Sequence, residues 1–203
     1  MSVSAIDRLR NMPDVFTLSR LASVSGVDRK HATVLLARWT QAGLARPAGP
    51  RSGVYYNLFK RPEITAEMMG TACEILYPSA VLAGESVLHN AGWTTQIPAN
   101  VSVAVLSRRT YAKLDGFEIT GRPKSWFLRV HPSIVAPHQA EFSTYGLRTL
   151  PPALALADLY ARRDAWRPDE DDLDIEPEQV ADLAEAFGRL GVEPPDFIGA
   201  NSG

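Results

Sequence analysis

The sequence has a single cysteine, no long hydrophobic run and no cluster of residues with metal-ligand spacing. Cys73 has no partner within the chain, which excludes an internal disulfide and is typical of a protein from a reducing compartment. The purest apolar run extends from Val103 to Leu106, which is far too short to span a bilayer. The segment MSVSAIDRLRNM lacks the apolar centre of a signal peptide. We therefore expect a cytoplasmic protein with no membrane span, no metal and no cofactor.

Motifs of enzyme catalysis are also missing. The chain contains no glycine-rich phosphate loop, no dinucleotide-binding fingerprint and no nucleophile–His–acid signature. Glu85 and His89 have helical spacing, but no third ligand accompanies them, and an ion pair explains the spacing better than a metal site does. Asp115, Glu118 and Lys124 are nuclease residue types without the acid-x-lysine spacing. We expect a protein that is not an enzyme, with a small Mg²⁺-dependent nuclease as an alternative.

Charge is distributed unevenly along the chain. Residues 1–61 carry ten Lys or Arg against three acids, a net charge of +7. Residues 62–163 have a net charge of +1, and residues 164–203 carry two basic against twelve acidic residues, a net charge of −10. Solvated faces are one explanation, but a strongly basic segment favours a polyanionic partner. For the acidic residues 169–174 we consider two roles, solubility and competition with DNA.

Residues 1–61 have the pattern of helix, helix, turn, helix and hairpin. Helices are expected over residues 2–11, 18–24 and 29 to about 41, with Thr17 and Asp28 as N-caps of the last two. The stretch LARPAGPRSGVYYNL predicts a β-hairpin, because a Pro/Gly-rich loop separates two strand-like runs. This order predicts a winged helix-turn-helix DNA-binding domain in residues 1–61.

The third expected helix has the features of a recognition helix. Ala22 and Gly26 allow two helices to cross closely, and Leu35 faces inward from the third helix. The outward residues are types that bond guanine, contact the thymine methyl group or reach phosphates. The residues expected to contact DNA are Arg29, Lys30, His31, Thr33, Val34 and Arg38 on this helix, and Arg46, Arg51 and Ser52 on the hairpin.

Beyond Pro62 the pattern becomes α+β, with one small sheet. Helices are expected over residues 63–76, 80–91 and 152–163, and strands at NVSVAVLS, GFEIT, WFLRVH and YGLRTL. The predicted organisation is an α+β domain over residues 62–168, then an acidic linker and a C-terminal amphipathic helix over residues 169–203. A second candidate DNA contact is the basic cluster of Arg108, Arg109 and Lys113.

Four successive segments carry a family resemblance: FTLSRLASVSGVDRKHATVLLARWTQAGLARPAGPRSGVYYNL, YPSAVLAGESVLHNAGWTTQIPANVSVAVLS, FLRVHPS and GLRTLPPALALADLY. In this order they resemble the AbiEi antitoxins of type IV toxin–antitoxin systems. The most characteristic passage surrounds Gly92, Gln96, Pro98 and residues 101–105. The acidic tail and the short second domain depart from the family pattern.

The resemblance implies a transcriptional repressor of its own operon. It also implies functional pairing with a separately encoded nucleotidyltransferase toxin, without a stable complex. Binding of double-stranded DNA at inverted repeats near the promoter would fit a dimer on DNA, because half-site symmetry mirrors protein symmetry. A winged-helix adaptor that docks only onto proteins is a further alternative.

Overall fold

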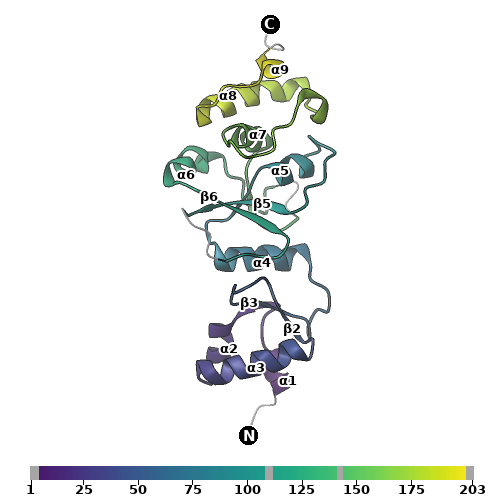
Figure 1. The fold of residues 1–203 in the computed structure, drawn as a ribbon, viewed down its shortest axis with the longest axis vertical. Helices are drawn as coiled ribbons and strands as arrows, with labels where there is room; N and C mark the ends of the chain where they lie inside the picture. Colours follow the sequence, from purple (N-terminus) through teal and green to yellow (C-terminus); the bar gives the residue numbers. More distant parts are fainter. Residues whose placement is uncertain (1–4, 108–111, 141–143, 200–203) are drawn as a thin grey trace. The chain divides into compact units, whose positions relative to one another are not determined.

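The structure is a computed structural model that describes residues 5–107, 112–140 and 144–199. It has an α+β architecture, as the sequence predicted, with short helices and two small sheets (Figure 1). The chain forms two compact units. The first unit contains residues 1–78, 111–115 and 144–146, and the second contains residues 79–110, 116–143 and 147–203. Among the helices in the described ranges, none has the length and apolar character that crossing a membrane requires.

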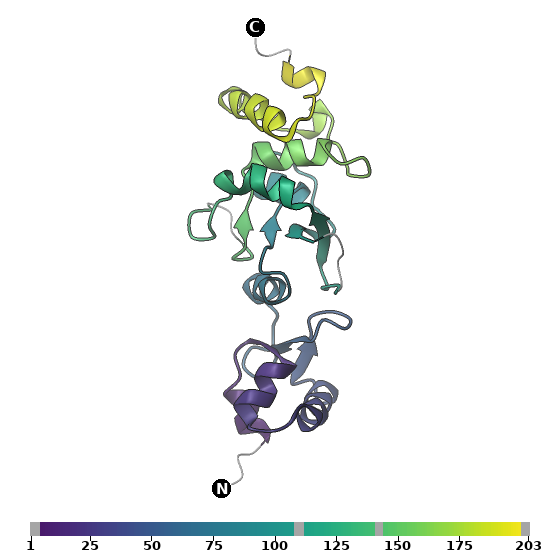
Figure 2. The ribbon, with the colours of Figure 1, turned by 90° about the vertical axis from the view of Figure 1, so that its left-hand side faces the viewer.

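The first unit is built around a pair of helices and a three-stranded antiparallel sheet (Figures 1 and 2). The strand order is β1-β3-β2, so the third strand lies in the centre. The predicted helices and hairpin are present, and an additional short strand precedes the second helix. The elements are α1 (Ala5–Arg10), β1 (Val15–Thr17), α2 (Leu18–Ser25), α3 (Arg29–Gln41), β2 (Ala45–Pro47), β3 (Val54–Asn57) and α4 (Ala66–Leu76).

The core of the first unit follows from the apolar spacing of its helices. Ala32, Leu36 and Trp39 lie on one face of α3 and are buried together with Leu21 of α2 and Phe16 of β1. This spacing of three and four residues is the period of a helix with one buried face. The opposite face of α3 is thereby left in solvent.

The second unit contains a four-stranded mixed sheet of order β6-β5-β4-β7. Strands β5 and β6 are parallel, β4 and β5 are antiparallel, and β4 and β7 are parallel. The elements are β4 (Val81–Leu82), α5 (Glu85–Asn90), β5 (Val101–Leu106), β6 (Phe117–Arg122), α6 (Lys124–Val130), β7 (Arg148–Thr149), α7 (Pro152–Tyr160), α8 (Val180–Leu190) and α9 (Asp196–Gly199), with short 3₁₀ turns at His131–Ser133, Glu170–Asp172 and Pro177–Gln179.

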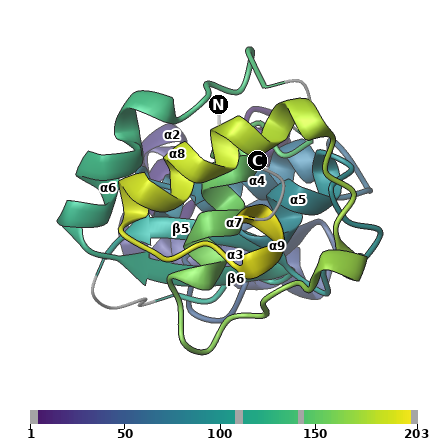
Figure 3. The same ribbon diagram turned by 90° about the horizontal axis from the view of Figure 1, so that it is seen from above.

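Helix α7 forms the centre of the second unit. All residues from Ala153 to Leu159 are buried, which is expected of a helix covered on every side. Helix α8 lies across it (Figure 3) and buries Leu183, Phe187 and Leu190. The amphipathic helix predicted near the C-terminus is therefore present, and it belongs to the same compact unit as the sheet.

Two sequence predictions about secondary structure are wrong. The expected helix over residues 80–91 begins only at Glu85, because Val81–Leu82 forms β4 and Gly84, the N-cap of the helix, has φ 59° and ψ −144°, a conformation outside the helical region. The stretch WFLRVH is helical rather than extended. Trp126 and Val130 lie four residues apart and are both buried, which is helical spacing.

A buried ion pair connects three elements of the second unit. The carboxylate of Asp158 on α7 accepts hydrogen bonds from Arg122 Nε at 3.2 Å and Nη2 at 2.5 Å at the end of β6. Trp126 Nε1 on α6 donates to the same carboxylate at 2.7 Å. The three donors satisfy the buried charge, so these elements are fixed to one another through one side chain.

We expect Asp158→Ala to lower the free energy of unfolding by about 3–5 kcal/mol, because it leaves the buried guanidinium of Arg122 without a counter-charge. Urea denaturation followed by circular dichroism measures this loss. Glu185→Ala is the control, since it removes an exposed ion pair with Arg189 and should change stability by about 1 kcal/mol or less. Equal effects of the two substitutions would contradict a supporting role for the buried pair.

Candidate nucleic-acid interface

The junction between α2 and α3 is fixed by local hydrogen bonds. Thr17 Oγ1 accepts from the Arg20 amide at 3.1 Å at the start of α2. Gly26 ends the helix in the left-handed region, with φ 61°, and its amide bonds to the carbonyls of Ala22 and Ser23. Asp28 Oδ1 then accepts from the His31 amide at 2.8 Å at the start of α3. Both caps and the turn lie where the sequence predicts them.

The outer face of α3 carries the predicted DNA-contacting residues. Val34 is 46% exposed although it is apolar. Thr33 Oγ1 donates to the Arg29 carbonyl at 2.8 Å, so its hydroxyl is engaged and its methyl group is the freer end. All six residues predicted to contact DNA from this helix are exposed: Arg29, Lys30, His31, Thr33, Val34 and Arg38.

His31 and Asp28 form a polar pair at the N-terminus of α3. His31 Nδ1 lies 2.9 Å from Asp28 Oδ1. The hydrogen bond from the His31 amide, together with that from its ring, lowers the pKa of the Asp28 carboxyl below its usual value. Asp28 is therefore ionised at neutral pH and occupies the end of the helix that favours negative charge.

The β2–β3 hairpin presents two exposed arginines, Arg46 on β2 and Arg51 in the loop. Arg51 has φ 56°, a left-handed conformation that is uncommon for a residue other than glycine. Ser52 differs from the prediction. Its side chain is buried and its hydroxyl donates to the Val54 carbonyl at 3.2 Å, so it shapes the loop and does not reach the surface.

The second basic cluster is only partly described. Arg108 and Arg109 lie outside the described residues. Lys113 is exposed and belongs to the first unit, together with Arg46 and Arg51. Sequence reasoning did not anticipate that residues 112–115 would lie against the hairpin, because no local signal connects positions so distant in the chain.

Positive charge on this surface is left without acidic partners. In the described ranges, no ion pair involves the cations of α3, of the hairpin or of residue 113 other than the His31–Asp28 contact. Three cations elsewhere in the first unit are paired: Arg10 with Asp7 at 3.6 Å, and Lys60 and Arg61 with Asp14 at 3.5 and 3.0 Å. The available cations are Arg29, Lys30, Arg38, Arg46, Arg51 and Lys113.

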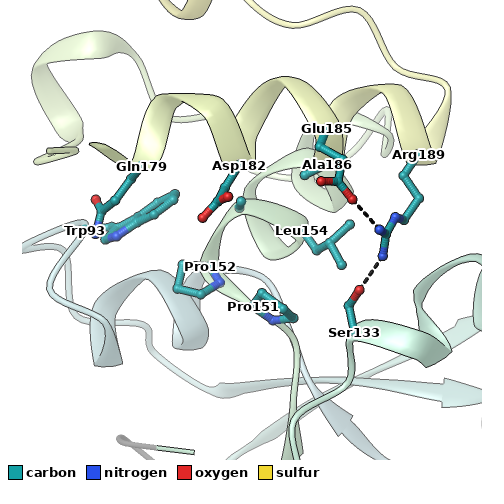
Figure 4. Close-up of a pocket in the computed structure, with 11 residues that line it drawn as sticks. Trp93, Ser133, Pro151, Pro152, Leu154, Gln179, Asp182, Glu185, Ala186 and Arg189 are labelled. Atoms are coloured by element: carbon teal, nitrogen blue, oxygen red, sulfur yellow. Dashed lines mark hydrogen bonds and ion pairs between the residues drawn. The ribbon is translucent and has the colours of Figure 1, made fainter. Parts of the chain in front are cut away.

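The second unit has a cleft between α7 and α8 (Figure 4), with a volume of about 320 Å³. Trp93 lies beside Gln179 at one end of the cleft, and Asp182 extends into it. At the other end, Arg189 bonds to both Glu185 and Ser133. A neighbouring hollow of about 340 Å³ is also lined by Trp93. The cleft lining contains neither histidine nor cysteine; its polar side chains include Ser133, Asp182 and Glu185.

The residues considered for a nuclease are divided between the two units. Asp115 belongs to the first unit, whereas Glu118 and Lys124 belong to the second. Glu118 Oε1 lies 3.6 Å from Arg162 Nη2. Burial, and to a lesser degree Glu118, raises the pKa of the Glu85 carboxyl. Within the part of the chain that the structure describes, no three His, Cys, Asp or Glu side chains form a metal-binding group.

We expect Gly26→Ala to lower the free energy of unfolding by about 1–2 kcal/mol, because alanine is disfavoured at a positive φ. Thermal unfolding followed by circular dichroism measures the change. The control is Gly188→Ala inside α8, where a Cβ would meet nothing within 4 Å and should be neutral or stabilising. If Gly26→Ala left the free energy of unfolding unchanged, the turn would be shown to tolerate another backbone conformation.

Comparisons with known proteins provide a fold relative and no family. No protein-family model matches the chain, and no curated protein matches its sequence. Among solved structures, the chain is similar to the RV2827C protein from Mycobacterium tuberculosis, with a TM-score of 0.61 and 15% sequence identity. The similarity covers 97% of this chain and 72% of that protein's chain. At this identity the comparison establishes a shared fold and leaves function to the residues themselves.

Proposed function

We propose that the protein is a DNA-binding transcriptional regulator whose first unit acts as a winged helix-turn-helix. The observation that carries the proposal is the set of exposed, unpaired cations on α3 and the adjacent hairpin, within a segment of net charge +7. The order α1-β1-α2-α3-β2-β3 and the three-stranded sheet support it, since α3 would be the recognition helix and the hairpin the wing.

In this proposal the N-terminal half of α3 enters the major groove. Arg29 bonds guanine through two nitrogens, and Val34 contacts a thymine methyl group. Thr33 acts through its methyl group because its hydroxyl already bonds the Arg29 carbonyl. Arg46 and Arg51 contact phosphates or the minor groove from the hairpin.

The biological role that we propose follows the resemblance to the AbiEi antitoxins. The protein would be cytoplasmic, repress its own operon from inverted repeats, bind there as a dimer, and oppose a nucleotidyltransferase toxin without a stable complex. The second unit would contribute to assembly and to this opposition. Neither alternative, a Mg²⁺-dependent nuclease or a docking adaptor, has a specific structural observation in its favour, and both remain outcomes of the binding experiment.

The test is fluorescence anisotropy without metal, with the duplex upstream of the protein's own gene and a random duplex, from 50 to 200 mM salt. We expect the upstream duplex to bind about 10³-fold tighter or more, with affinity falling steeply as salt rises. Failure of both duplexes to bind would overturn the proposal and favour the docking adaptor. Cleavage on addition of Mg²⁺ would favour the nuclease.

Two substitutions separate base reading from phosphate contact. Arg29→Ala should cost about 1–3 kcal/mol on the upstream duplex and much less on random DNA, because it removes a base contact. Arg51→Ala should weaken binding to both duplexes by a similar factor, because it removes a phosphate or minor-groove contact. Equal losses on both duplexes for Arg29→Ala would exclude a base-reading role for this residue.

A further inference from the structure

We propose that residues 112–115 form a third part of the DNA-binding surface. Their backbone holds the hairpin in place, and Lys113 contacts a DNA phosphate beside it. This inference rests on the proposed function, because it joins one residue of the second candidate cluster to the same interface and assigns residues 112–115 the role of a support. Four features of the first unit support it.

The backbone of the segment is joined to the base of the hairpin loop. The Asp115 amide donates to the Ala48 carbonyl at 2.9 Å. A Cβ added to Gly49 would lie 2.1 Å from the Lys113 carbonyl oxygen and 2.9 Å from the Leu114 Cα. No side chain fits into that space, so position 49 must be glycine for the two backbones to approach this closely.

The segment is itself held from its other side. The Tyr77 hydroxyl, just beyond α4, donates to the Ala112 carbonyl at 2.6 Å and accepts from the Ala112 amide at 3.2 Å. Leu114 is only 3% exposed. Hydrogen bonds hold the backbone at both Ala112 and Asp115, and the side chain of Leu114 between them is buried. The segment is therefore a fixed support for the hairpin.

The hairpin loop is short, and this support lies at its base. The Ala48 amide donates to the Val54 carbonyl at 2.9 Å and closes the loop that contains Arg51. The Ala48 carbonyl points the other way and accepts from Asp115. A loop held on both sides of one residue keeps its arginine in a defined position, which lowers the entropy lost when it binds.

The charges around the segment explain why Lys113 is the contacting residue. Lys113 is exposed and, in the described part of the chain, has no acidic partner. Asp115 lies near Tyr56 of β3. Burial is the main cause that raises the pKa of Tyr56 to about 12; the charge of Asp115 also raises this pKa, and the charge of Arg46 lowers it. A lysine is a compact point charge suited to phosphate, so its contribution carries no sequence preference.

The first experiment compares Lys113→Gln with Lys124→Gln in the full chain, on the upstream and the random duplex. Both variants lose one positive charge, but Lys124 is an exposed residue of the second unit. We expect Lys113→Gln to weaken binding to both duplexes by about threefold to tenfold and to reduce the salt slope by about 1. Lys124→Gln should leave both quantities unchanged.

The second experiment compares Gly49→Ala with Gly188→Ala. We expect Gly49→Ala to speed hydrogen exchange at the amides of residues 48–54 and to weaken binding to both duplexes, because the Cβ displaces the hairpin from its support. Gly188→Ala should change neither measurement. Unaltered exchange in Gly49→Ala would overturn the role of residues 112–115 as a support.

The outcomes distinguish this inference from the proposed function. Wild-type protein that binds neither duplex overturns the proposed function and the Lys113 contact with it, whereas hydrogen exchange still tests the support. Wild-type protein that binds normally, with Lys113→Gln equal to Lys124→Gln, overturns the Lys113 contact alone.

Discussion

Burial of Leu21, Ala32, Leu36 and Trp39 in one core is the constraint on which the candidate interface depends. Those side chains fix the rotation of α3 about its own axis, because its apolar face must leave water. Once the rotation is fixed, the remaining positions of the helix point outward. The cations on α3 therefore share a surface because the core determines which face of the helix is exposed. They are not held together by any attraction between them.

Three acids of the first unit are engaged by residues other than the arginines and lysines of α3 and the hairpin. The acids of the first unit near α1 and β1 are taken by cations outside α3: Asp7 pairs with Arg10, and Asp14 with Lys60 and Arg61. Asp28 serves as the cap of α3 and bonds His31. None of these three carboxylates forms an ion pair with an arginine or lysine of α3 or the hairpin. An unscreened basic surface raises the local concentration of a polyanion and speeds its association.

The sequence predicted best what is decided within a few residues. Thr17, Gly26 and Asp28 act through neighbours three or four positions away, so the helix boundaries around them could be predicted. The errors lie where distant segments decide. Val81–Leu82 is a strand because it pairs with both β5 and β7, which overrides its helical surroundings. The sequence prediction placed Ser52 on the surface. Ser52 is buried because the loop closes with its hydroxyl bonded to the Val54 carbonyl, and the sequence pattern does not show that bond.

The same distinction explains why the first unit is more than its first 61 residues. Gly49 and Gly70 are not required for an unusual backbone angle. A Cβ on Gly70 of α4 would lie 1.7 Å from the Tyr145 carbonyl oxygen, just as one on Gly49 would meet the carbonyl of Lys113. Each glycine marks a place where a later segment of the chain approaches an earlier one, backbone against backbone. The geometry of the hairpin, and with it the position of Arg51, thus depends on residues 112–115. Periodicity and turn signals in the sequence assign those residues to the second predicted domain.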